Sequence, residues 1–276
     1  MAQTENLDWG AVMQLFQPYH YAAFDDPKPT LDDPATVSQR LLVRDALLRL
    51  DAMLWPIIGQ SGWDLHRHRH PAHYVSSDHF VTLDDGTQVV NYIDGMWLHY
   101  GKSPEQLDFI KLQVGGYDYK RRDDEEYYNA FYLHTRIQFY LNSDVFRAWL
   151  LLATDKNYYD RSEFLKRIER STNERDRLFQ LVRPLFGRGF TYRIEEEELQ
   201  LRRNLTQDRL IRFVRRDRPG FYSGIYKEYD PSDSALDESR IRDEMIENLT
   251  LLYPLYDFMA YRFDTRARGQ RKTKPA

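Results

Sequence analysis

The residues with the clearest chemical potential are the arginines of "RRNLTQDRLIRFVRRDR", residues 202–218. This stretch holds seven arginines against two acids. On a helix, arginines at i, i+3 and i+7 form one cationic face beside an apolar one. Guanidinium groups fork onto phosphate oxygens, and the nearby "FYSGIY" supplies aromatic rings that can stack on bases. The pattern predicts binding of nucleic acid or a phosphorylated partner through Arg209, Arg212, Arg215 and Arg216.

Two other charged segments bear on this interpretation. The acidic run "IEEEEL", residues 194–199, lies just upstream and is typical of a surface network that pairs with arginines. The C-terminal residues 265–276 add five positive charges without an acid, and we expect them to form a basic, disordered tail. The tail favours phosphate binding, whereas the acidic run favours a neutralised surface.

A histidine-rich segment, "WDLHRHRHPAHYVSSDHF", holds five of the eight histidines of the chain. Alternate residues of an extended strand share a face, so its first three histidines point the same way. Imidazole nitrogens are typical ligands of a divalent metal, although the intervening arginines repel a dication and no known metal motif is present. The sequence implies no other cofactor. The metal-site hypothesis concerns His66, His68, His70 and His73.

Two further motifs concern catalysis and nucleotide binding. The segment "YDYK" spaces Asp118 and Lys120 as in Mg²⁺-dependent nucleases, where the carboxylate binds the metal and the lysine positions water. The segment "DGMWLHYGKS" ends like a phosphate-binding loop, but five residues separate Gly95 from Gly101 and three of them are bulky. We interpret it as a strand that runs into a turn. A metal-dependent hydrolase or nuclease using residues 66–79 or Asp118 and Lys120 is the alternative function.

Composition excludes several classes of site. The 276 residues carry a formal net charge of -4 and no cysteine, which excludes disulfides, thiolate nucleophiles and cysteine-ligated metals. A pI of about 6.1 is unlike that of a general polyanion binder, which is basic overall. No apolar run is long enough to cross a bilayer, and no signal peptide is recognised. We therefore expect a soluble, cytoplasmic protein without a membrane partner.

Periodicity predicts both helices and hairpins. Apolar residues recur at helical spacing after Asp33, a predicted N-cap, and this helix is expected to end at Pro56. Hairpins are predicted around residues 84–86 and around Asn142 and Ser143, the second of them near the centre of a sheet. Further strands are expected at residues 190–194 and 221–230. Further helices are expected at residues 103–114, 161–170, 174–186 and 206–216. A last long helix is expected to begin at about residue 239 and to bend or end at Pro254.

This order of elements favours an α+β fold, with an antiparallel or mixed sheet with hairpins flanked by several amphipathic helices. We expect a single domain over residues 1–264, with an N-terminal helical part at about residues 1–58. The sequence favours a binding protein over an enzyme. A protein–protein interaction scaffold or homo-oligomer that uses aromatic surface is a further alternative.

Overall fold

The computed structural model describes residues 14–28, 33–67, 79–82, 88–103, 105–106, 134–152, 159–218 and 222–260, with the backbone alone at 79–82 and 88–92. The chain divides into two compact units. Unit 1 contains Met1–Ser103, Ile137–Leu150 and Ile225–Leu252. Unit 2 contains Pro104–Arg136, Leu151–Gly224 and Tyr253–Ala276. The single domain over residues 1–264 stays a prediction.

Seven strands form one sheet in the order β1-β4-β5-β6-β9-β7-β8, and β2 and β3 form a separate antiparallel pair. Strand β4 runs antiparallel to both β1 and β5, and β7 runs antiparallel to β8. Together with the helices, this sheet confirms the predicted α+β class. The strands are β1 (His66–Arg67), β2 (His79–Thr82), β3 (Gln88–Tyr92), β4 (Gly95–Gly101), β5 (Arg136–Asn142), β6 (Phe146–Leu152), β7 (Thr191–Ile194), β8 (Glu197–Gln200) and β9 (Ser223–Tyr229).

Two predicted strand features are confirmed. The "GKS" segment is the strand β4 followed by a turn, because Gly95 to Tyr100 pair in register with residues 142 to 137 of β5. The hairpin of β5 and β6 turns at Asn142, whose Oδ1 accepts hydrogen bonds from the backbone N–H groups of Asp144 (3.0 Å) and Val145 (2.9 Å). Such a turn, closed by an asparagine side chain, is set by local sequence.

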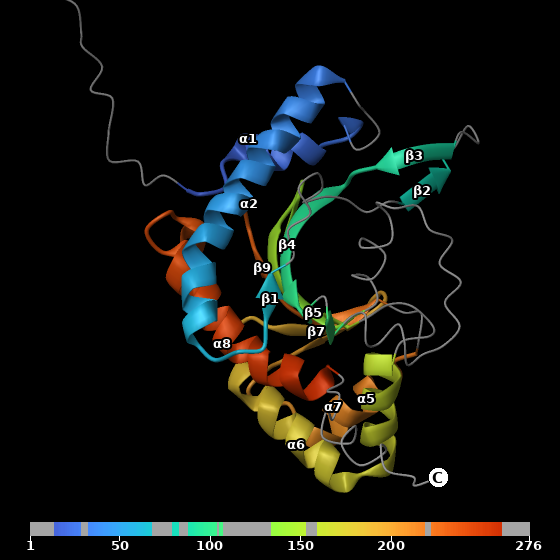
Figure 1. Cartoon of the computed structure of the whole chain (residues 1–276). Helices are drawn as coiled ribbons and strands as arrows, with labels where there is room; N and C mark the ends of the chain where they lie inside the picture. The colour runs from blue at the N-terminus through green and yellow to red at the C-terminus, as the bar shows by residue number, and fades with distance from the viewer. Residues whose placement is uncertain are drawn as a thin grey trace, which may run out of the picture. The chain divides into compact units, whose positions relative to one another are not determined.

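In unit 1, helix α2 (Pro34–Gln60) runs along strands β1 and β4 (Figure 1). It begins as predicted, with Asp33 Oδ1 accepting from the N–H groups of Ala35 and Thr36. The buried carboxylate of Asp51 on α2 accepts a hydrogen bond from the Tyr100 hydroxyl at 3.0 Å. The unit also contains α1 (Pro18–Tyr21), the 3₁₀ turns Ala22–Phe24 and Ser234–Leu236, and the first part of α8 (Ile241–Met259).

A predicted helix end is not found at either of two prolines; the bend that was the alternative at Pro254 stays a prediction. Helix α2 continues through Pro56 to Gln60, and α8 continues through Pro254 to Met259. A proline removes the hydrogen bond to the carbonyl four residues earlier. Those carbonyls belong to Ala52 and Thr250, which are both exposed residues. Neither helix ends at its proline.

In unit 2, three helices pack around a small apolar core. They are α5 (Tyr159–Arg170), α6 (Thr172–Val182) and α7 (Gln207–Val214), with a 3₁₀ turn at Arg183–Leu185 after α6. Helix α6 contacts both α5 and α7 (Figure 1). Fully buried side chains fill the space between these elements, including Phe164, Leu178, Val182, Leu210 and Val214.

The acidic run of residues 194–199 forms a strand that the sequence analysis did not predict. Residues 197–200 are β8, joined to β7 by the turn Glu195–Glu196. Glu195 has a positive φ of 52°, which a non-glycine residue rarely adopts. Its N–H donates to the Tyr222 carbonyl at 2.7 Å and its carboxylate accepts from the Tyr222 N–H. Contacts distant in sequence therefore hold this turn.

Several predictions fall on residues outside the described part. These are the N-terminal residues 1–13, the hairpin turn at 84–86, the tail 265–276, and most of the helix expected after Ser103, of which the structure describes residues 105 and 106. Among the described helices, none combines the length and apolarity needed to cross a membrane.

Candidate anion-binding surface

Helix α7 and the turn that follows it place the four predicted arginines on the surface. Thr206 is its N-cap, with the side-chain oxygen accepting from the Arg209 N–H at 3.4 Å, and its buried residues anchor the other side. We call residues 202–218 the arginine segment. Arg209, Arg212, Arg215 and Arg216 are all exposed, and so are the other three arginines of the segment, Arg202, Arg203 and Arg218.

One of the two acids in the arginine segment does not reach the surface. Asp217, just beyond α7, is 1% exposed and forms an ion pair with Arg161 of α5, which is fully buried. The guanidinium makes a second contact, from Nε to Asp217 Oδ2 at 3.2 Å. Burial raises the pKa of Asp217, and the Arg161 charge acts in the opposite direction. Asp217 thus anchors the end of α7, and Asp208 is the one exposed acid in the segment.

The arginines of the segment are mostly paired with neutral groups. Arg202 donates to the Gln200 amide oxygen at 3.0 and 2.7 Å, Arg212 to a backbone carbonyl of Asp208 at 3.3 Å, and Arg218 to two backbone carbonyls. Within the described residues, only Arg216 has a carboxylate partner, Glu197 of β8. The predicted ion pairing with residues 194–199 is confirmed for Arg216. No described carboxylate neutralises the other arginines of the segment.

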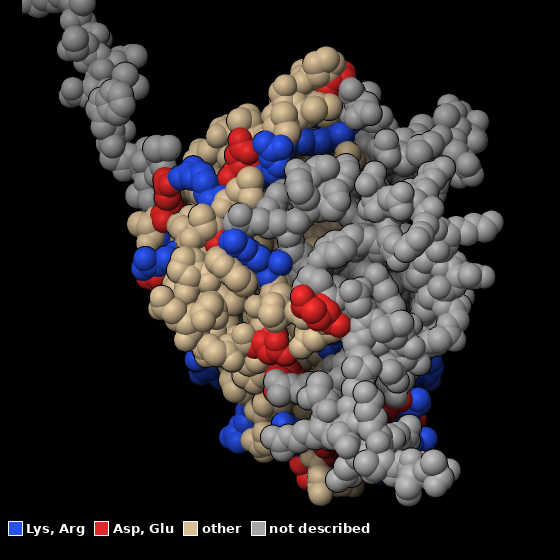
Figure 2. Space-filling model, viewed as in Figure 1, with Lys and Arg blue, Asp and Glu red and all other residues tan. Residues whose placement is uncertain are grey.

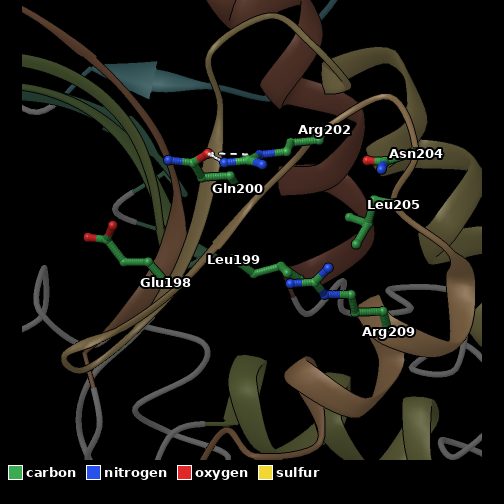
Figure 3. A pocket seen from close by; sticks show the side chains of 7 residues that line it. All are labelled: Glu198, Leu199, Gln200, Arg202, Asn204, Leu205 and Arg209. Carbon is green, nitrogen blue, oxygen red and sulfur yellow. Dashed lines mark hydrogen bonds between the residues drawn. The ribbon is translucent and has the colours of Figure 1, made fainter.

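A hollow of about 310 Å³ lies beside α7 (Figure 3). Arg202 and Arg209 are both at its wall, although one precedes the helix and the other belongs to its first turn. The apolar side chains of Leu199 and Leu205 contribute to the lining and are more than nine-tenths buried. The complete lining consists of Glu198, Leu199, Gln200, Arg202, Asn204, Leu205 and Arg209.

The hollow combines hydrogen-bond donors with an apolar patch. Arg209 has no side-chain partner among the described residues, and the same is true of the Asn204 amide. In Figure 3 the Glu198 side chain extends away from the other six, whereas the Arg209 guanidinium lies towards Leu199. The Arg202 guanidinium lies beside Gln200 in the same view. The lining thus supplies two guanidinium groups and an amide, and arginine forks are suited to anions.

Sequence reasoning missed the residues that shape this hollow. Strand β8 brings Gln200 next to Arg202, but its acidic composition does not resemble a strand. Asn204 lies in the turn just before the N-cap Thr206, and that turn is the one local signal for a concave site in "RRNLT". The four predicted residues include one, Arg209, that lines the hollow.

The aromatic part of the prediction, which concerned "FYSGIY" at residues 221–226, finds little support. Tyr226 is 5% exposed and packs edge-on against Trp149, with 5.9 Å between ring centroids, so it cannot stack on a base. Tyr222 is half-buried and its backbone contacts Glu195. Phe221 lies outside the described residues. The described residues of the arginine segment offer charge rather than exposed aromatic rings.

The metal-site hypothesis stays untested. His66 lies on β1, half-buried, with Nε2 3.1 Å from Asp64 Oδ1. His68, His70 and His73 are outside the described residues, as are Asp118 and Lys120. Within the part of the chain that the structure describes, no group of three or more histidine or acidic side chains is arranged to hold a metal ion.

Comparisons with known proteins add no relative: no protein-family model matches the sequence, and no curated protein is significantly similar to it. In unit 2, the arginine segment and its hollow are where exposed, unneutralised charge gathers on one stretch of chain.

Proposed function

We propose that the chain binds nucleic acid through its phosphate groups, using the arginine segment. The observation that carries this proposal is the charge that remains at the surface: seven exposed arginines, one exposed acid and one ion pair to a carboxylate. Cationic side chains that lack protein counterions attract phosphates and release the counterions bound to them. Nucleic acid offers several phosphates in a row, which suits a row of arginines better than a single modified side chain does.

The dimensions of α7 agree with contacts to consecutive phosphates. Its eight residues span about 12 Å at about 1.5 Å per residue. Along one strand of a duplex this length corresponds to about three to four nucleotides at about 3.4 Å each. Arg209 lies in its first turn, Arg212 lies in its last turn, and Arg216 lies two residues beyond its end. The segment can thus follow a short stretch of backbone.

The kind of recognition follows from the side chains present. Phosphate contacts position a nucleic acid without reading its sequence, and of the described aromatic residues at 222–226, Tyr226 is buried and Tyr222 is half-buried. Binding is therefore expected to be sequence-tolerant and strongly dependent on salt. The formal net charge of -4 means that attraction of nucleic acid depends on local clusters of positive charge, such as this segment.

The test is fluorescence anisotropy with labelled single-stranded and duplex oligonucleotides at two salt concentrations. Arg212→Glu should weaken binding about tenfold or more at low salt and reduce the slope of log affinity against log salt by at least about 1. The matched control is Arg242→Glu, which makes the same charge change at an exposed residue of α8 in unit 1 and should leave affinity within about twofold.

The same samples are incubated with and without Mg²⁺, and the oligonucleotides are then examined for cleavage. Saturable binding without cleavage, lost in Arg212→Glu and kept in Arg242→Glu, supports the proposal. Absence of binding at low salt overturns it. Equal loss in both variants also overturns it, because the effect would then come from net charge rather than from the arginine segment.

A further inference from the structure

The hollow differs from the rest of the arginine segment because it is concave and draws its donors from two directions. Arg202 enters from the turn after β8, and Arg209 enters from the first turn of α7. Gln200 holds Arg202 through two hydrogen bonds to one amide oxygen, which orders the guanidinium and leaves its remaining N–H groups available. The Gln200 amide is neutral, so the charge of Arg202 is not compensated there.

An internal phosphodiester fits this hollow poorly. It carries one negative charge and is flanked by sugars on both sides, so it suits a convex or flat surface. A terminal phosphomonoester is esterified on one side only, can enter a concave site, and carries about -1.5 to -2 charges near pH 7. Two arginines that approach from different elements can contact different oxygens of such a group.

Size and lining agree with a terminal nucleotide. A volume of about 310 Å³ exceeds what a phosphate alone fills and is at the small end of the range for ligand sites. Leu199 and Leu205 offer an apolar surface for the sugar or base, and the Asn204 amide offers a further donor. Glu198 also lines the hollow, but its side chain extends away from the two arginines (Figure 3).

We propose that this hollow binds the terminal phosphate of a nucleic-acid strand, so that the protein prefers phosphorylated ends. The inference rests on the proposed function, because the rest of the arginine segment would hold the adjoining backbone. Arg202 and Arg209 contact the phosphate, and Gln200 acts on it indirectly by orienting Arg202.

The experiment compares oligonucleotides of one sequence and length that carry a 5′-phosphate, a 3′-phosphate or hydroxyl groups at both ends. Binding is measured by competition against one labelled hydroxyl-ended strand. The intact protein should bind at least one phosphorylated form about tenfold more tightly than the hydroxyl form. The two phosphorylated arms show which end enters the hollow.

Three variants distinguish binding of the terminal phosphate in the hollow from the general electrostatic attraction of nucleic acid to the arginine segment. Arg209→Gln should remove the preference for a phosphorylated end and keep part of the binding to the hydroxyl form. Arg209→Lys keeps the charge without the fork and should retain only part of the preference. Arg215→Gln removes one charge from the same segment outside the hollow, so it should weaken both forms alike and keep their ratio.

The outcomes distinguish the two proposals. If the intact protein binds hydroxyl and phosphorylated forms equally and in a salt-dependent way, the inference about the hollow is wrong and the proposed function stands. If Arg215→Gln removes the preference as fully as Arg209→Gln does, the preference comes from overall charge and the inference is also wrong. If no form binds at low salt, the proposed function itself fails.

Discussion

The surface of α2 in unit 1 and the arginine segment in unit 2 both carry arginines, but they differ in how those charges are paired. On α2, Arg44 contacts Asp45 at 3.1 Å, Arg49 pairs with Glu238, and the buried Arg40 donates to the Lys28 carbonyl at 2.6 Å. Figure 2 shows blue and red side chains lying beside one another where Figure 1 draws this helix. Within the arginine segment, by contrast, one acid is buried with Arg161 and one is exposed, so few carboxylates can pair with its arginines.

The difference shows why a charge count along the sequence is a poor guide to surface charge. Asp217 and Asp45 each count as one negative charge in the sequence. Asp45 remains at the surface beside Arg44, whereas Asp217 is enclosed with Arg161 and contributes nothing to the screening of α7. The interior contact thus makes the surface more basic than the local sequence is.

The largest expected effect comes from breaking the buried pair. Arg161→Met leaves the Asp217 carboxylate without its partner in a desolvated site, and we expect the free energy of unfolding to fall by about 3–5 kcal/mol. The double variant Arg161→Met with Asp217→Leu should recover most of this loss, since no buried charge remains. Chemical denaturation of the three proteins measures the effect. A loss below about 1 kcal/mol in the single variant would mean that Asp217 is hydrated and screens the arginines.

Unit 1 contains a buried ionisable side chain for which burial favours the neutral form rather than an ion pair, His20. Burial, followed by the nearby Arg49 charge, lowers its pKa from 6.5 to about 4, and its Nδ1 accepts the Gln17 N–H at 2.8 Å. Between pH 6.5 and 4 the unfolded chain binds a proton that folded His20 does not, so stability is lost as the pH falls through this range. The contribution is roughly 3 kcal/mol.

Denaturation at pH 7 and pH 4.5 measures this effect, with His20→Asn as the reference. The asparagine cannot titrate, and its side-chain oxygen can still accept from the Gln17 N–H. The intact protein should lose more stability than the variant between the two pH values. Equal losses would show that His20 is protonated in the folded state and that the contrast with Asp217 does not hold.

The smallest expected effect concerns the one carboxylate that pairs within the arginine segment. Glu197→Gln releases Arg216 and should tighten oligonucleotide binding about two- to threefold at low salt, while stability changes by less than about 1 kcal/mol. Glu238→Gln is the control, because it changes net charge equally but releases Arg49 on α2. It should leave binding unchanged. If both variants bound the oligonucleotide more tightly by the same factor, the arginine segment would not differ from the surface of α2 in its contribution to binding.

Much of the fold was predictable because its signals are local. Asp33 caps α2, Asn142 closes the turn between β5 and β6, and Thr206 caps α7, each through a side chain that bonds to backbone within three residues. Strand β8 was not predictable, because its acidic residues do not resemble a strand and its turn depends on Glu195 and distant Tyr222. The helix end predicted at Pro56 was also wrong, because α2 continues through it to Gln60.

For the candidate site, the sequence by itself determined the helix α7, the exposed side on which Arg209, Arg212 and Arg216 lie, and the excess of arginine over acid. These follow from helical spacing and from the solvation of charge. The hollow is also lined by one short stretch, residues 198–209, but it was missed because strand β8 was not predicted. Tertiary structure alone decided that Asp217 is withdrawn to Arg161, which lies 56 residues earlier in the chain. The physical reason is that burial arises when segments far apart in the chain pack together, and local spacing carries no record of that packing.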